Sequence, residues 1–276
     1  MADLQFKVSP NIVLGTYISS RLGLYAKEWG DRYMVIVDPV LKEVRNMNTL
    51  YDSLATRYIN YFTFDEVQAD VDLPDRTKML STLAYLLGMQ GIEEYKVMLS
   101  VALDNGINPV EVKEVLYQAV DYLGLGRVLP FFKVTNDILL SRGVKLPLEG
   151  QATTTMDNRL EKGEETQIRL FGPQMKDFAK KGTINKWLVD NCFGDYYTRK
   201  GLNDNDREMV TFCYIAAQGG CEPQLLAHAQ ANIKLGNDKE FLMKVIEQNV
   251  PFIGYPRSLN AVTIVNKADE AVNGKD

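Results

Sequence analysis

The sequence predicts a mainly α-helical protein in which two tandem helical repeats follow a small α/β segment. Three observations support this prediction. Most of the chain after Asp75 consists of apolar segments with helical spacing, separated by glycines. The chain also matches itself at an offset of 130 residues. Before these segments, residues 1–74 place two short apolar runs around an amphipathic stretch, which is typical of a β-α-β unit.

The composition is that of an ordinary soluble globular protein, with 46% hydrophobic and 24% charged residues. A net charge of -5 and a pI near 5.2, without a basic stripe, argue against a nucleic-acid partner. The sequence has no apolar run of membrane-spanning length and no basic-then-apolar leader, so we expect a cytoplasmic protein without a membrane partner. Three cysteines without paired spacing fit a reducing compartment, and a single histidine disfavours a zinc site.

The α/β segment is predicted from its apolar runs. We expect strands at residues 11–15 and 33–37 with a helix at 19–29 between them, then a helix at 40–61 and a third strand at 61–67. The stretches SPNIVLGTYISSRLGLYAKEWGDRYMVIVDPVLKEV and FTFDEVQADVDLP resemble the opening of the iron-containing alcohol dehydrogenases. The glycine-rich pyrophosphate loop and the Asp/His metal ligands of that family have no counterpart downstream. We therefore expect no bound dinucleotide or metal, and a structural or assembly role for this segment.

The helical part divides into a first repeat at residues 75–143, a linker at 144–167 and a second repeat at 168–276. The linker is predicted from Pro147, Gly150, a run of three threonines and Gly163. The expected helices of the first repeat are Arg76–Leu87, Ile92–Leu103, Pro109–Tyr122 and Arg127–Ser141. Those of the second repeat are Phe171–Lys180, Ile184–Phe193, Arg207–Gln218, Glu222–Leu235, Asp238–Gln248 and Arg257–Val272.

The repeat is indicated by identities at helix ends and along helix faces. At an offset of 130 the identical pairs are Gly106 and Gly236, Val115 and Val245, Gln118 and Gln248, Val120 and Val250, Gly124 and Gly254, Arg127 and Arg257, and Asn136 and Asn266. The polar residues of the second copy do not repeat. Gly91 stands opposite Cys221, Met98 opposite His228, and Thr77 or Lys78 opposite Glu208. Any chemistry therefore belongs to the second copy.

The candidate site lies on a predicted helical hairpin in the second repeat. Gly219 and Gly220 end the first helix, and Cys221 takes the N-cap position of the second. With a rise of about 1.5 Å per residue, Glu208 lies level with residues 228–232 of the partner helix and can face His228, the only histidine of the chain.

Two further residues lie near this pair. Gln224 is one turn before His228 on the same face, whereas Cys221 is two turns before it, roughly 10 Å along the axis. Structural roles explain the same residues: a satisfied core histidine, an acidic first-turn residue, and a small buried cysteine.

The stretches GDYYTRKGLNDNDREMVTFCYIAAQGGCEPQLLAHAQANIKLG and VPFIGYPRSLNAV resemble the carboxymuconolactone decarboxylase family, whose alkylhydroperoxidase branch shares the fold. The peroxidase motif is a Glu, a Cys-x-x-Cys pair, and a His four residues after the second Cys. Glu208 and His228 match it, and Cys221 falls on the first Cys. Gln224 stands where the second would be, so a dithiol cycle lacks one thiol.

The decarboxylase branch implies loss of CO2 from a carboxylated lactone without a cofactor. In this interpretation His228 and Glu208 transfer the proton, and Gln224 donates a hydrogen bond to a carboxylate or oxyanion. A thiol-dependent peroxidase that uses Cys221 and an external thiol is an alternative. A third is a non-catalytic helical assembly protein. Single-copy relatives form ring-like hexamers, which implies a homo-oligomer here, either a trimer with pseudo-sixfold symmetry or a dimer.

Overall fold

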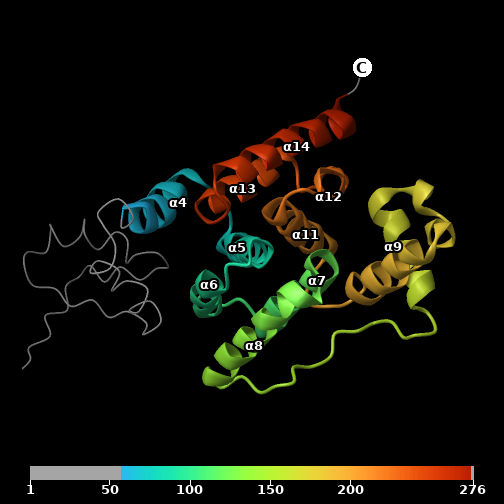
Figure 1. Cartoon of the computed structure of the whole chain (residues 1–276), viewed down its shortest axis with the longest axis horizontal. Coiled ribbons are helices and arrows are strands. Elements are labelled where there is room, and N and C mark those ends of the chain that lie inside the picture. Colours follow the sequence, from blue (N-terminus) through green and yellow to red (C-terminus); the bar gives the residue numbers. More distant parts are fainter. Residues whose placement is uncertain (1–56, 275–276) are drawn as a thin grey trace, which may run out of the picture. The chain divides into compact units, whose positions relative to one another are not determined.

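The computed structural model describes residues 57–274, and in this range the chain consists of helices joined by loops, with no strand (Figure 1). The chain divides into two compact units, Met1–Asp70 and Val71–Asp276. None of the described helices is both long and apolar enough to cross a membrane.

In the first unit, the described residues form a helix, η2 (Arg57–Glu66), which continues into α4 (Val67–Asp70). The strand predicted at 61–67 is therefore wrong. The rings of Tyr58 and Phe62 lie 5.1 Å apart, a contact between neighbouring helical turns, and a short apolar run fits a helix as well as a strand. The strands predicted at 11–15 and 33–37, and the helix at 19–29, lie outside the described residues.

The second unit begins with four helices that agree with the predicted ones to within a few residues. They are α5 (Asp75–Met89), α6 (Ile92–Asp104), α7 (Pro109–Leu123) and α8 (Leu125–Ser141). Local signals explain their ends: the side chains of Asn108 and Glu111 cap the start of α7 reciprocally, and Pro109 occupies its first turn. Gly124, with a φ of 81°, separates α7 from α8.

The segment between the repeats differs from the prediction. Helix α9 (Arg159–Phe171) begins inside the stretch expected to be a linker. Gly163, which suggested a linker, instead permits a close helix contact, because a Cβ there would overlap the carbonyl of Val189. The helix expected at 171–180 is two short 3-10 turns, and the helix expected at 184–193 is divided. These elements are η3 (Pro173–Met175), η4 (Phe178–Lys181), α10 (Thr183–Trp187) and η5 (Leu188–Tyr196).

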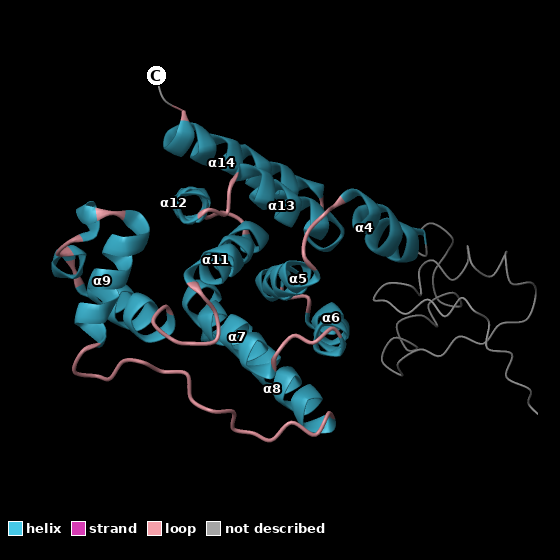
Figure 2. Cartoon of the chain, turned by 180° about the vertical axis from the view of Figure 1, so that it is seen from behind, coloured by secondary structure: helices cyan, strands magenta, loops and turns pink. Residues whose placement is uncertain are grey.

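The last four helices repeat the pattern of the first four. They are α11 (Asp204–Gln218), α12 (Glu222–Leu235), α13 (Lys239–Ile253) and α14 (Tyr255–Asn273). The paired glycines keep equivalent backbones: Gly106 and Gly236 have φ of 82° and 101°, and Gly124 and Gly254 have φ of 81° and 75°. Helices α5 and α11 pack against each other (Figures 1 and 2). Both are buried along most of their length. The core therefore lies where the two repeats meet.

Candidate active site

The α11–α12 hairpin forms as the sequence predicts. Gly219 and Gly220 have positive φ angles of 69° and 72°, and Cys221 is the N-cap of α12. The hairpin places His228 opposite Glu208, with Nδ1 and Oε2 2.7 Å apart. The Asn232 amide donates to the backbone carbonyls of both residues, at 2.9 Å each. Three side chains therefore fix this crossing of the two helices.

Glu208 and His228 form a buried pair with one unused oxygen. Glu208 is 0% exposed and His228 7%. The carboxylate can only accept, so it favours the tautomer in which Nδ1 carries the proton and leaves Nε2 for a ligand. Glu208 Oε1 is buried and has no hydrogen-bond partner among the described residues. Such an oxygen is costly unless a water or a ligand donates to it.

Two aromatic rings enclose the imidazole edge to face. The ring centroid of Tyr122, from α7, is 5.4 Å from that of His228, and the centroid of Phe171, from α9, is 5.3 Å away. The interplanar angles are 81° and 86°. The first repeat, the connecting segment and the second repeat thus each contribute to the site. The sequence predicts Tyr122 and Phe171 only as the last and first residues of two helices, and not as part of a site.

A second group of polar side chains lies beside these rings. The Tyr122 hydroxyl is 3.0 Å from that of Tyr197 and 3.7 Å from the Cys192 sulfur. Burial raises the pKa of all three groups well above the usual values, and the nearby charge of Glu208 raises each pKa further. The phenols and the thiol therefore stay protonated at neutral pH. Tyr197 lies in the GDYY stretch, which is the sequence signal that could have pointed to it.

Gln224 is not brought to the Glu208–His228 pair. It is exposed in the first turns of α12, and its amide makes no hydrogen bond to either residue in the described part of the chain. The pair is instead completed by aromatic residues from other elements.

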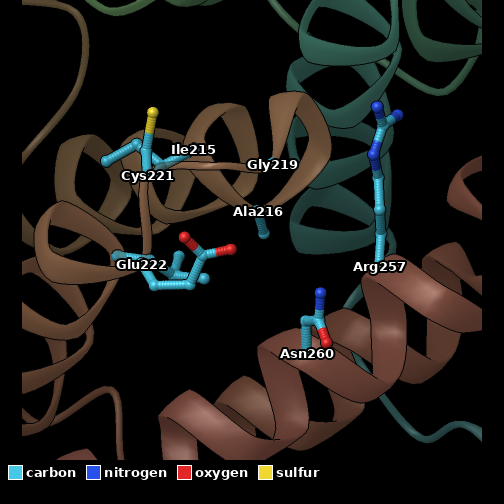
Figure 3. Close-up of a pocket in the computed structure, with 8 residues that line it drawn as sticks. Ile215, Ala216, Gly219, Cys221, Glu222, Arg257 and Asn260 are labelled. Carbon is cyan, nitrogen blue, oxygen red and sulfur yellow. The ribbon is translucent and has the colours of Figure 1, made fainter.

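Cys221 lies at a separate small cavity. Its sulfur is 3.6 Å from the Gln218 amide nitrogen, and no hydrogen bond joins it to His228 within the part of the chain described. Figure 3 shows Cys221 and Glu222 at the start of α12, across the cavity from Arg257 and Asn260. The cavity volume is about 10 Å³, close to the minimum for one water molecule. It is too small for an organic substrate.

The described residues also contain no group of three or more His, Cys, Asp or Glu arranged to hold a metal ion. Cys192 and Cys213 are both buried, and burial raises the pKa of both thiols. Neither is therefore a reactive thiolate in this structure.

The sequence model of the carboxymuconolactone decarboxylase family matches the chain twice, at residues 54–137 and 183–267. Together these matches cover more than half of the chain. The protein belongs to the carboxymuconolactone decarboxylase family. The double match confirms the tandem repeat, and its first copy includes η2 and α4. No curated protein matches the chain. The resemblance of residues 6–74 to iron-containing alcohol dehydrogenases stays a prediction.

The two family repeats differ in what occupies equivalent positions. Met98 is 2% exposed in α6, where the second repeat has His228, and Gly91 stands in place of Cys221. An apolar thioether cannot transfer protons, so the first repeat has no equivalent of the Glu208–His228 pair. It contributes instead to the enclosure of the site in the second repeat, through Tyr122.

Proposed function

We propose that this family member is a small-molecule lyase that removes CO2 from a carboxylated lactone or a related acid. The observation that carries this proposal is the 2.7 Å hydrogen bond between His228 Nδ1 and Glu208 Oε2. A carboxylate that is wholly buried and bonded to an imidazole orients the ring and stabilises its positive form. That arrangement suits a group that gives a proton to carbon.

The proposed reaction has two steps. In the first, the bond between the lactone ring carbon and the carboxylate breaks, CO2 leaves, and the electron pair is delocalised as a dienolate onto the lactone carbonyl. In the second, the imidazolium of His228 donates its Nε2 proton to a carbon of the dienolate, and the neutral imidazole regains a proton from water. Glu208 stays ionised and keeps Nδ1–H directed toward itself. The chain's own residues thus bind, orient and protonate.

A peroxidase based on Cys221 receives less support. The thiol contacts Gln218, its cavity holds about one water molecule, and Gln224 stands where a resolving thiol would be needed. The two functions predict opposite results for Cys221→Ala. If Cys221→Ala consumes hydroperoxide as fast as the wild type, the thiol mechanism is excluded. If the variant loses this activity, the thiol mechanism is supported over the lyase.

The lyase is tested with carboxymuconolactone as substrate and CO2 release as the readout. We expect turnover by the wild type and a loss of about a hundredfold or more in kcat for His228→Asn and Glu208→Leu, because general acid catalysis contributes roughly 10²–10⁴-fold. Gln224→Leu, one turn before His228 on the exposed side of α12, is the matched control and keeps most of the activity. Turnover that is unchanged in His228→Asn contradicts the proposal.

A further inference from the structure

The segment between the two repeats presents a cluster of exposed apolar side chains. Figure 1 shows α9 and the short helices that follow it together at one edge of the helical unit. We call the cluster the Trp187 patch, and its members are Met156, Leu160, Ile184, Trp187 and Leu188. They are five of the twelve large apolar residues that are exposed in the described part of the chain. Such a concentration on one surface indicates a contact with a partner.

The patch consists of one side of a helix and one open cleft. Helix α10 continues directly into η5, and Ile184, Trp187 and Leu188 lie on one side of it because they are three and four residues apart. Ile184 is 75% exposed and Trp187 60%. Trp187 also lines one wall of a cleft of about 630 Å³, whose other wall includes Met156 and Leu160. The apolar side chains on both walls are therefore open to solvent.

Lysines accompany these apolar side chains. Residues 173–188 contain four lysines and one acid, Asp177, which is an excess of three positive charges in a chain whose net charge is -5. Lys186 lines the same cleft as Trp187. All four lysines are exposed: Lys176, Lys180, Lys181 and Lys186. The patch thus combines apolar and basic groups on η4 and α10.

The acids near the patch are paired or lie on another element. Asp177 pairs with Lys180 at 2.7 Å, and Asp190, in the cleft, pairs with Arg159 at 3.0 Å. Helix α9 contains three glutamates, and Asp157 lies on the α9 side of the cleft. The positive excess is therefore confined to the side formed by η4 and α10.

We propose that the Trp187 patch docks the protein on an anionic lipid surface. An indole is well suited to the boundary between lipid headgroups and acyl chains, and the aliphatic side chains bury apolar area there. Lysines lay their stems along the apolar surface and place their ammonium groups on anionic headgroups, so the charges of the two surfaces are complementary. Such docking needs no spanning helix, in agreement with the described helices, and it replaces the expectation of no membrane partner. It goes beyond the lyase function and does not depend on it.

The first measurement is cosedimentation of the full chain with vesicles of phosphatidylcholine, or of phosphatidylcholine and phosphatidylglycerol in equal amounts. We expect binding to the mixed vesicles at low ionic strength, and weaker binding to phosphatidylcholine or at high salt. The double variant Lys180→Gln/Lys181→Gln should bind the mixed vesicles roughly 25-fold more weakly, because each basic side chain at such a surface contributes about fivefold. The control Lys145→Gln/Lys234→Gln removes the same charge at other exposed positions and should bind like the wild type.

The second measurement follows Trp187 itself. The chain has two tryptophans, so Trp29→Phe leaves Trp187 as the single indole. Its fluorescence emission should move to shorter wavelength when the mixed vesicles are added. Trp187→Ala should weaken binding roughly tenfold, because it removes a large apolar side chain from the lipid contact. Tyr61→Ala, at an exposed aromatic residue of η2, is the matched control and should bind like the wild type.

Wild-type protein that binds neither kind of vesicle overturns the proposal, and equal binding to both kinds overturns the anionic assignment. Equal binding by Trp187→Ala and the wild type shows that any lipid contact lies elsewhere, which also overturns it. Two other occupants of the patch give distinct results. A mass in light scattering that Trp187→Ala lowers indicates a contact between copies of the chain, and retention on immobilised polyglutamate without vesicle binding indicates an acidic protein. Either result contradicts the lipid surface, and unfolding curves confirm that all variants are folded.

Discussion

The carboxyl group of Asp121, next to Tyr122 in the sequence, should make the stability of the protein fall as the pH rises. Burial raises its pKa from 3.8 to about 7, a hydrogen bond from Cys192 lowers it in part, and the charge of Asp195 raises it further. Its Oδ2 atom is buried without a hydrogen-bond partner among the described residues. Nothing at that oxygen therefore offsets the loss of solvation when the group ionises.

The direction of this pH dependence follows from which state of the chain, folded or unfolded, holds the Asp121 proton more tightly. The folded chain keeps Asp121 protonated up to a pH of about 7, whereas the unfolded chain releases the proton near 3.8. Its contribution to stability is thus full below the unfolded pKa and is lost as the pH rises through the folded pKa. At about 1.4 kcal/mol per pKa unit, the contribution lost between pH 4.5 and 8 is about 3 kcal/mol.

The substitution Asp121→Asn removes the titratable carboxyl group and keeps the shape of the side chain. We expect the free energy of unfolding of the variant, relative to wild type, to rise by about 3 kcal/mol between pH 4.5 and 8. Urea unfolding followed by circular dichroism at several pH values measures this difference. Asp157→Asn, at an exposed aspartate, is the control and should give a curve parallel to wild type. A parallel curve for Asp121→Asn would refute the reasoning.

Three further predictions concern the Glu208–His228 pair, the ion pairs of Glu114 with Arg199 and Arg207, and the assembly of the protein. Nitrogen NMR of the single imidazole should show the neutral ring protonated on Nδ1 in wild type and in Gln224→Leu, but not in Glu208→Leu, because Glu208 Oε2 accepts that proton; a wild-type ring protonated on Nε2 contradicts the assigned geometry. Glu114→Gln should cost about 3 kcal/mol of unfolding free energy, since the Glu114 side chain is 1% exposed and pairs with Arg199 and Arg207. Glu93→Gln, at an exposed pair with Lys96, is the control and should cost at most about 0.5 kcal/mol. Equal losses of the two variants in urea unfolding exclude a special role for the buried ion pairs of Glu114. We also expect a homo-oligomer, a trimer or a dimer, because the equivalent positions Leu129 and Leu259 are both exposed and apolar; light scattering should give a mass above 31.2 kDa that Leu129→Glu lowers, and a wild-type monomer at micromolar concentration refutes this.

The helical fold could be predicted because its determinants are local. Apolar spacing and glycine breaks predict seven of the helices in the repeats to within three residues, and the eighth, α13, continues five residues past its predicted end at Gln248. The connecting segment could not be predicted in this way. Gly163 and Gly194 lie where two backbones touch, since a Cβ at either would overlap a carbonyl of the other element. In the sequence, a glycine that permits close packing cannot be distinguished from one that ends a helix.

The Glu208–His228 pair was predictable for a geometric reason. Both residues lie on one hairpin, so the rise of a helix and the position of the turn are enough to bring them together. Tyr122 and Phe171 are 106 and 57 residues before His228, and their approach depends on tertiary packing that spacing does not encode. The expectation for Gln224 failed for a related reason. Residues that share a helix face need not share a cavity when the first turn is exposed to solvent.

The unequal repeats follow from how the two copies pack. Helices α5 and α11 are buried against each other, so neither copy can be lost without exposing the core of the other. This requirement preserves the first copy whether or not it performs chemistry, and Met98 and Gly91 occupy the positions that His228 and Cys221 have in the second copy. The α7 helix of the first copy nevertheless ends at the ring of His228. The first copy thus packs against the imidazole of the second through Tyr122, although it has no proton-transfer pair of its own.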